Sequence, residues 1–364
     1  MMYYSPPRPG APKAVGAYIF AGGFTIGVSH FFNVVAHLEE SNYGVRTAQR
    51  NFPNVDIYVK PERWPLLRLH EQHDVDLLYC NPPCALFSTA GATMRGGHDA
   101  WKRDPRQACW KNCFVAFEAL QPKIFAIESV VRAYTAGREF IDMFVELATA
   151  LGYSTTHLLC DAQWLGLPQR RKRYFMIFHK VDIDFEPNHQ RRRTINEVLK
   201  LVKKPGPSLR VKDPIHQALI PQVKPGTNMR PLWEAMVPES ERKLDAYGRT
   251  IGRPRMFVHR MNGDGVMGTL AGDYFIHPTE DRFLGVNEMK VLNGYPEDYW
   301  LEGHRDSHAS FLARGVTPAV AYWLASHFRR AIDRNQPCAE VTQREIDFRT
   351  PSPEILEESC IVCP

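Results

Sequence analysis

Short apolar runs alternate with segments of helical spacing along the first half of the chain, between residues 17 and 178. The runs at 76–80, 123–127 and 173–178 have the length and composition of buried strands. At 106–120 and 138–151 apolar residues recur at helical spacing, and the second segment stops at Gly152, a residue type that often ends helices. This alternation predicts an α/β protein built on a doubly wound, mostly parallel sheet that is covered by helices.

The alternation stops between residues 183 and 270, where prolines such as Pro205, Pro214 and Pro231 interrupt any long helix. Helical spacing returns at 287–293 and 318–332, and periodicity is lost after Ile332. We therefore expect a catalytic and cofactor-binding domain over 1–182, completed by a return segment over 271–335. A smaller inserted domain would cover 183–270, and 336–364 would form a poorly ordered C-terminal tail.

The composition is that of an ordinary globular protein, with 44% hydrophobic and 23% charged residues among 364. No apolar stretch approaches the roughly 18 residues that span a membrane, and the N-terminus lacks the layout of a signal peptide. We expect a cytoplasmic protein without a membrane partner, whose eight cysteines are reduced. The net charge of +5 is weak evidence for nucleic acid, but the basic clusters at 170–173 and 191–193 could bind phosphates.

Cys84 stands directly after two prolines that end the apolar run at 77–80. Because prolines stop strands and stiffen the turn that follows, the thiol would be held at the carboxyl end of a buried strand. Ligands bind at this edge of open α/β sheets. A single cysteine is often just a small core residue, but this position favours a nucleophile.

Two further groups of polar residues lie at or beside the ends of predicted strands. Glu128 follows the run 123–127, where burial would raise the pKa of its carboxyl and keep it protonated. Gln169, Arg171 and Arg173 alternate, so in a strand they would point to one face. The structural alternatives are a helix cap or an ion pair for Glu128 and a solvated edge for the other three.

A glycine-bearing turn at 20–28, Phe-Ala-Gly-Gly-Phe-Thr-Ile-Gly-Val, follows the first strand-like segment. Glycines at such a turn let the backbone approach a ligand at the start of a helix. Glu39 follows the next strand-like run, where an acidic residue can bind ribose hydroxyls. Glycine turns are common, so this feature alone is a weak signal.

In their order along the chain, these motifs resemble those of the C5-cytosine DNA methyltransferase family. The segment 20–28 resembles its first cofactor motif, 81–84 (Asn-Pro-Pro-Cys) its nucleophile motif and 128–130 (Glu-Ser-Val) its Glu-Asn-Val motif. Gln169, Arg171 and Arg173 match its Gln-x-Arg-x-Arg motif in full. The segments 282–296 and 316–321 resemble its late motifs, so the resemblance covers about residues 17–330.

The resemblance implies a Rossmann-like fold that binds S-adenosylmethionine, with a target-recognition domain in the insertion. It implies that the Cys84 thiolate attacks C6 of a cytosine flipped out of double-stranded DNA, after which C5 takes the methyl group. Glu128 would hydrogen-bond the ring while Arg171 and Arg173 orient it. The setting would be a bacterial or phage-infected cell, and we expect no obligatory protein partner.

The resemblance also implies which residues surround the two ligands, and the loop at 88–98 would close over the flipped base as a lid. The residues implied at the substrate are Ser88, Ser129 and Gln169. Those implied at the cofactor are Phe20, Ala21, Gly22, Gly23, Phe24, Glu39, Asp56, Ile57, Pro82, Arg314 and Val316.

The chain departs from the family pattern mainly around the cofactor. The glycine turn is about two residues short, Ser129 replaces the usual Asn, and Ala85 replaces a common Gln. Ala313 and Arg314 stand where the last motif usually has Gly-Asn. A permanent cation is unfavourable beside a sulfonium, so Arg314 either points to solvent or DNA phosphate or pairs with a carboxylate on carboxy-S-adenosylmethionine. The second alternative would make the product 5-carboxymethylcytosine.

Three other hypotheses remain at the level of sequence. An RNA cytosine methyltransferase has a similar design, but the insertion of about 85 residues favours DNA by leaving room for a recognition domain. A non-catalytic DNA-binding homologue is disfavoured by the intact Cys84 and Glu128. Cys360 and Cys363 have zinc-like spacing without a clear second pair, so we predict no metal.

Overall fold

The computed structural model describes residues 2–350 apart from 7, 88–99, 188, 209–210, 212, 246–249, 255–257 and 271–274. Eight strands form one sheet in the order β10-β6-β7-β5-β4-β1-β2-β3. Only β7 runs antiparallel to its neighbours, β5 and β6, which confirms the predicted mostly parallel α/β sheet. The strands are β1 Lys13–Ala17, β2 Asn33–Glu39, β3 Asp56–Val59, β4 Leu77–Cys80, β5 Ile124–Ser129, β6 Ser154–Asp161, β7 Lys172–His179 and β10 Gln343–Phe348.

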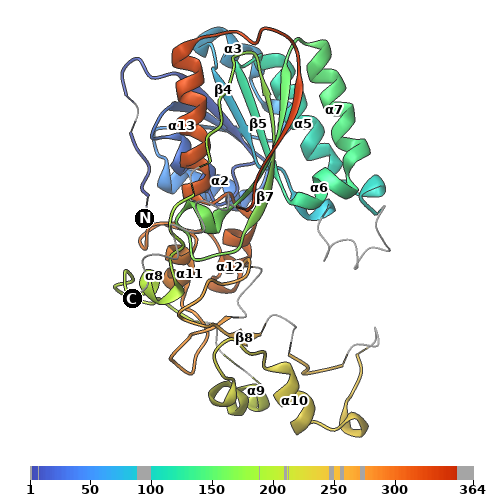
Figure 1. Cartoon of the computed structure of the whole chain (residues 1–364), viewed down its shortest axis with the longest axis vertical. Coiled ribbons are helices and arrows are strands. Elements are labelled where there is room, and N and C mark those ends of the chain that lie inside the picture. Colours follow the sequence, from blue (N-terminus) through green and yellow to red (C-terminus); the bar gives the residue numbers. More distant parts are fainter. Residues whose placement is uncertain are drawn as a thin grey trace.

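Helices cover both faces of this sheet, with α13 on one side and α5 and α7 on the other (Figure 1). Buried side chains form a separate apolar cluster on each face, since alternate residues of a strand point to opposite sides. The helices of this part are α1 Gly23–Val28, α2 Asn42–Asn51, α3 Leu66–His73, α5 Gln107–Leu120, α6 Val131–Ala136, α7 Arg138–Ala150, α11 Val286–Leu292, α12 Arg305–Arg314 and α13 Pro318–Arg334. The predicted helices at 106–120, 138–151, 287–293 and 318–332 are thus confirmed.

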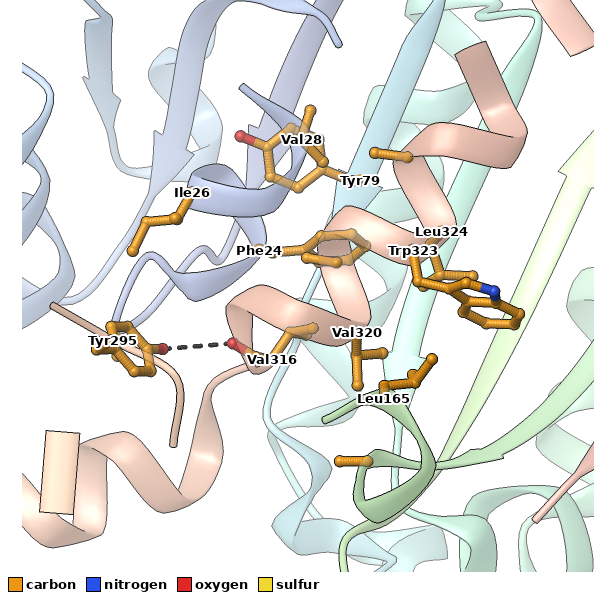
Figure 2. Packing of buried hydrophobic residues seen from close by; sticks show 14 of the residues in the cluster. Phe24, Ile26, Val28, Tyr79, Leu165, Tyr295, Val316, Val320, Trp323 and Leu324 are labelled. Carbon is orange, nitrogen blue, oxygen red and sulfur yellow. Dashed lines mark hydrogen bonds between the residues drawn. The ribbon is translucent and has the colours of Figure 1, made fainter. Parts of the chain in front are cut away.

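The core is tightly packed where α1 meets α13, directly behind the glycine turn (Figure 2). Phe24 of α1 packs its ring against Tyr79 of β4, with the centroids 4.9 Å apart. A side chain at Gly27 would collide with the backbone of α13, because a Cβ there would lie 2.4 Å from the Tyr322 nitrogen. This close approach fixes the end of α1 against the C-terminal helix.

The described residues of the proline-rich segment 183–270 form short elements. They are α8 Ile195–Leu199, α9 Pro214–Leu219, α10 Arg230–Met236 and the two-residue strand β8 His259–Arg260, which pairs with β9 Phe275–Ile276. Part of it has an apolar cluster of its own, Leu219, Ile220, Val223, Met229, Trp233, Val258, Ile276 and Phe283. This cluster reaches past residue 270, whereas α8 packs on the core of the large sheet.

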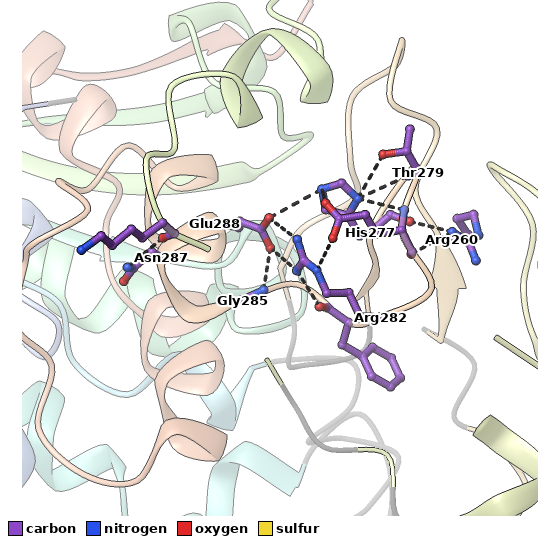
Figure 3. Close-up of polar contacts among 10 residues, drawn as sticks. Arg260, His277, Thr279, Arg282, Gly285, Asn287 and Glu288 are labelled. Carbon is purple, nitrogen blue, oxygen red and sulfur yellow. Dashed lines mark hydrogen bonds and ion pairs between the residues drawn. The ribbon is translucent and has the colours of Figure 1, made fainter. Parts of the chain in front are cut away.

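A buried polar network joins this smaller part to α11 (Figure 3). Arg282 donates to both carboxylate oxygens of Glu288, at 2.7 and 2.8 Å, and Glu288 also accepts from the Gly285 nitrogen at 2.6 Å. On the other side, Arg260 donates to the His277 carbonyl at 3.1 Å. The segment 277–288 therefore connects β8 to α11 through hydrogen bonds.

The prediction of a poorly ordered chain after Ile332 is wrong for Gln343–Phe348. This segment forms β10, which pairs in parallel with β6 at the edge of the large sheet. Its exposed and half-buried residues alternate, and Ile346 and Phe348 pack against the core. Pairing with β6 and the packing of its apolar face stabilise this strand. Its sequence is too polar to be identified as a buried strand from the pattern of apolar residues.

Candidate active site

Cys84 lies where the sequence predicts it, just beyond the carboxyl end of a buried strand. The residues of β4 are completely buried between β1 and β5. Pro82 and Pro83 carry the chain out of the sheet, and Cys84 begins a short 3-10 helix, Cys84–Leu86, in a partly exposed position. The Trp110 indole nitrogen donates to the Pro83 carbonyl at 3.4 Å, which fixes this turn against α5.

Glu128 is a buried carboxyl with two partners at the catalytic edge. Its Oε2 accepts from the Asn81 amide at 2.6 Å, and its Oε1 is 2.7 Å from Nε of Arg173. Burial raises the pKa of Glu128, while Arg173 and Arg171 act in the opposite direction. Asn81 was not singled out from sequence, although it stands in the motif that contains Cys84.

Arg171 is a second buried charge, held by the segment between α12 and α13. Its Nη2 donates to the carbonyls of Ala313 and Gly315 at 2.8 and 2.5 Å. Burial, followed by the neighbouring Arg173, lowers the pKa of Arg171 to about 9. Asp161, which sequence reasoning missed, accepts from the Arg171 backbone nitrogen at 2.9 Å and so positions this residue.

Several buried polar atoms at this edge have no hydrogen-bond partner among the described residues. They include Oδ1 of Asn81 and both Nε and Nη1 of Arg171. Buried donors and acceptors are costly unless they are paired, so unpaired ones that gather in one place fit a polar ligand. The set offers one acceptor and two donors beside the Glu128 carboxyl.

The Cys84 thiol is close enough to these groups for them to change its pKa. Burial raises the pKa first and Glu128 raises it further, while Arg173 and Arg171 lower it. The net direction is upward, so at neutral pH the thiol is protonated in the protein alone. Cys84, Glu128, Arg171 and Arg173 are therefore brought together as the sequence predicts.

The predicted substrate residues Gln169 and Ser129 are not grouped with these four. Gln169 donates to the Asn293 side chain at 3.1 Å and accepts from the Leu270 nitrogen at 3.2 Å, so both ends of its amide bind the chain itself. Ser129 follows Glu128 along β5 and so points to the opposite face. Ser88 and the loop 88–98 lie outside the described residues.

The glycine turn lies beside Glu39, as expected of a cofactor site. Glu39 accepts from the Phe20 nitrogen at 3.2 Å through Oε2 and from the Glu40 nitrogen at 2.9 Å through Oε1. Burial raises the pKa of Glu39, and these backbone donors oppose the rise. The carboxyl thus links the carboxyl ends of β1 and β2, where a ribose diol would find two acceptor oxygens.

The glycines of this turn contact protein atoms. Gly22 has φ +75°, and a Cβ there would lie 2.3 Å from the Tyr299 hydroxyl. A Cβ on Gly23 would lie 2.1 Å from the Val316 carbonyl oxygen. The Tyr299 hydroxyl also donates to the Ala21 carbonyl at 2.8 Å. Ala21, Gly22, Gly23 and Val316 therefore come together.

One predicted cofactor contact needs correction. Phe24 is a core residue, because its ring is buried between Tyr79 and Phe175. Asp56 and Ile57 lie at the amino end of β3, and Val59 is the register partner of Glu39 at the carboxyl end. The assignment of Asp56 and Ile57 to the cofactor stays a prediction.

Arg314 is exposed at the end of α12, with its guanidinium carbon 5.8 Å from the centre of the Phe20 ring. Tyr43 and Phe311 also approach Phe20, with ring centroids 6.0 and 5.9 Å away. Sequence reasoning missed these two rings, and the only signal was that Tyr43 lies shortly after Glu39. Pro82 is buried between β4 and Cys84.

A family model described as C-5 cytosine-specific DNA methylase matches residues 18–330, so the chain belongs to this family and is an enzyme of the DNA cytosine-5 methyltransferase type. It is similar to the type II methyltransferase M1.HphI of Haemophilus parahaemolyticus, with 26% identity over 84% of this chain and 83% of that protein. M.HgiDI of Herpetosiphon aurantiacus is 24% identical over 89% of this chain and 96% of its own length.

Solved structures share the fold. A chain from an E. coli prophage, described as a DNA modification methyltransferase, superposes with a TM-score of 0.63 at 19% identity, covering 89% of this chain and all of that one. The Dnmt2 methyltransferase of S. pombe gives 0.56 at 11% identity, over 88% and 99%. The architecture is therefore the Rossmann-like methyltransferase fold, and membership of the family implies S-adenosylmethionine as the methyl donor.

The described residues contain neither a metal-binding cluster nor a membrane-spanning helix. His, Cys, Asp and Glu side chains in this part of the chain form no group of three that could hold a metal ion. Cys360 and Cys363 lie outside it. None of the described helices combines the length and apolar character needed to cross a bilayer.

Proposed function

We propose that this protein methylates C5 of a cytosine that is flipped out of double-stranded DNA, through a covalent bond between Cys84 and C6. The observation that carries the proposal is the buried Glu128 carboxyl, held by Asn81 and Arg173 beside a cysteine at the end of β4. A carboxyl with a raised pKa can donate a hydrogen bond to N3 of the base, which a carboxylate could not do.

The chemistry assigns one role to each group. The Cys84 sulfur forms a bond to C6, which makes C5 an enamine carbon that can accept a methyl group. Glu128 stabilises the charge that develops on the ring, and the unpaired donors of Arg171 supply hydrogen bonds to its oxygen. After the C5 proton is lost to a base, the electron pair re-forms the C5–C6 double bond and Cys84 leaves as a thiolate.

S-adenosylmethionine supplies an electrophilic methyl group on a sulfonium. We propose that Glu39 binds its ribose and that the turn at 20–23, together with Val316, forms the adjoining wall. Phe20, Tyr43 and Phe311 provide aromatic surface on the same side. The fit rests on the two oxygens of a buried carboxyl at the carboxyl edge of the sheet.

A second candidate is transfer of a carboxymethyl group from carboxy-S-adenosylmethionine. The observation that favours it is Arg314, a cation placed over the Phe20 ring at the rim of the proposed cofactor site. A guanidinium pairs well with a carboxylate and poorly with a sulfonium. Ordinary methylation remains the first proposal because the named relatives are methyltransferases.

We further propose that the insertion at 183–270, extended to Phe283 by its apolar cluster, recognises the DNA target. Specificity would come from its loops contacting base edges. We also propose that the enzyme acts in the cytoplasm of a bacterial or phage-infected cell, since relatives such as M1.HphI come from bacteria. An RNA-only substrate profile would refute the assignment of DNA.

The decisive experiment is mass spectrometry of DNA nucleosides after incubation with the purified protein and each cofactor separately. Methylation predicts a deoxycytidine that is heavier by about 14 Da when S-adenosylmethionine is supplied. Carboxymethylation predicts 5-carboxymethyldeoxycytidine, and only when carboxy-S-adenosylmethionine is supplied. Cys84→Ala should abolish either product. An active Cys84→Ala protein, or unmodified DNA in every case, would refute the proposal.

A further inference from the structure

The basic segment 170–173 divides its charges between two environments. Arg171 and Arg173 are buried near Glu128, whereas Arg170 and Lys172 are exposed. Successive side chains of an extended strand point to opposite faces, so Arg170 and Lys172 lie on the face of the sheet away from Glu128. The proposed catalysis uses Arg171 and Arg173 and gives no role to Arg170 and Lys172.

Arg170 and Lys172 line an open cavity of about 510 Å³ together with Arg132. Its other lining residues are Val130, Val131, Thr135 and Thr269. The lining thus contains three cations and no carboxylate. The nearby Asp347, whose pKa is lowered in part by Lys172, already pairs with Arg349 at 2.5 Å. This balance of charge suits an anion.

The cavity opens at the catalytic edge of the sheet, where β5 ends and β7 begins. In Figure 1, α6 lies at this edge, on the side of the sheet toward the inserted part. The Thr269 hydroxyl donates to the Arg170 carbonyl at 2.8 Å, and the Arg170 nitrogen donates to the Met267 carbonyl at 2.9 Å. The end of the insertion therefore holds this basic segment in place.

We propose that this cavity binds a phosphodiester group of the DNA strand that carries the target cytosine. The inference rests on the proposed function, because each DNA strand carries one charge per roughly 3.4 Å of helix axis. A strand whose base enters beside Cys84 must therefore place phosphates only a few residues away along β7. Arginine and lysine side chains are the usual partners of such phosphates.

The test compares two double variants that each remove two cations from the same strands. Arg170→Gln with Lys172→Gln removes two of the cavity's three cations, while Lys123→Gln with Lys180→Gln removes two cations at the opposite edge. Lys123 and Lys180 are adjacent there, since the Lys180 nitrogen donates to the Lys123 carbonyl at 2.9 Å. The substrate is a labelled duplex that contains a position modified by the wild-type enzyme. Binding is measured at salt concentrations from about 50 to 300 mM, because salt progressively screens phosphate contacts over this range.

The cavity variant should show a slope of log K against log salt that is smaller by about 1 to 2, because about 0.9 is lost per phosphate. Its KM for DNA should rise roughly tenfold while kcat changes little, and Arg170→Lys with Lys172→Arg should restore the slope. Equal slopes in the wild type and the cavity variant would refute the phosphate site. Failure of the proposed function is read separately, from a wild-type protein that modifies no DNA.

Discussion

The pKa of the Cys84 thiol is set by burial and by nearby charged groups that act in opposite directions. Burial and Glu128 raise the pKa of the thiol, and the two arginines lower it. Because the pKa of the thiol lies above its ordinary value, the thiolate fraction stays small at neutral pH and grows only in the alkaline range. The protein without DNA therefore keeps its nucleophile protonated, and a bound base that takes up the Glu128 hydrogen bond changes this balance.

Alkylation of Cys84 by iodoacetamide should be slow at pH 7 and should accelerate through the alkaline range, because only the thiolate reacts. The rate is measured by mass spectrometry of the peptide that contains Cys84. Alkylation that is already complete and independent of pH near neutrality would contradict a raised pKa.

Glu128→Gln should affect reactivity and transfer in opposite directions. Removing the Glu128 charge removes one cause of the raised pKa, so Cys84 should be alkylated faster at pH 8. Transfer to DNA should fall by roughly 10² to 10⁴, because the general acid is lost. Glu118→Gln, a change on the exposed side of α5, serves as the control and should alter neither rate.

Among the elements, the glycine turn is held mainly by packing against protein. Gly22 and Gly23 have no room for a side chain because Tyr299 and Val316 fill the space. The shortened turn thus brings α1 directly against the segment that precedes α13. At position 23 only glycine fits, because a Cβ would collide with neighbouring protein atoms. At position 22 glycine is favoured by the same crowding and also by the positive φ of the backbone.

Gly23→Ala should therefore destabilise the protein by about 1 to 3 kcal/mol, the usual cost of overpacking, and reduce binding of S-adenosylmethionine. A Cβ at Gly268 meets no atom within 4 Å, so Gly268→Ala should leave stability within about 0.5 kcal/mol. Urea denaturation and calorimetric titration of the cofactor measure the two effects. Equal stability of the two variants would show that the turn can open to admit a methyl group.

At the scale of the whole molecule, a buried carboxylate of α11 pairs with the segment that follows β9. Arg282 pairs with Glu288, whose side chain is 4% exposed, and with Glu280, whose side chain is 54% exposed. Both pairs have an N···O distance of 2.7 Å, but the pair with Glu288 is buried and bidentate, whereas the pair with Glu280 is exposed and has one hydrogen bond. Loss of one partner of a buried pair leaves an uncompensated charge, whereas an exposed pair contributes little.

Glu288→Ala should thus lower the free energy of unfolding by about 3 to 5 kcal/mol, while Glu280→Ala should lower it by less than about 1 kcal/mol. Thermal and urea unfolding provide the comparison. If the two variants lost equal stability, the network would not be a structural link between the two parts.

Much of the fold could be predicted because its strands are short apolar runs and its long helices have regular spacing. The strand β6 was missed because five of its buried positions are polar, Ser154, Thr155, Thr156, His157 and Asp161. Hydrogen bonds that no local pattern shows satisfy most of these side chains, such as the one at 3.0 Å between Thr156 and His179. The strand β10 was missed because only its pairing with β6 orders it.

The sequence by itself determined the class of protein and the four residues Cys84, Glu128, Arg171 and Arg173, because residue type and order along the chain carry that information. Tertiary structure alone decided which neighbours hold these groups. Asn81 and Asp161 reach the site through side-chain geometry, and Phe24 is withdrawn into the core by helix packing. Strand register likewise decided that Val59 is the partner of Glu39, because pairing between distant segments is not encoded in either segment alone.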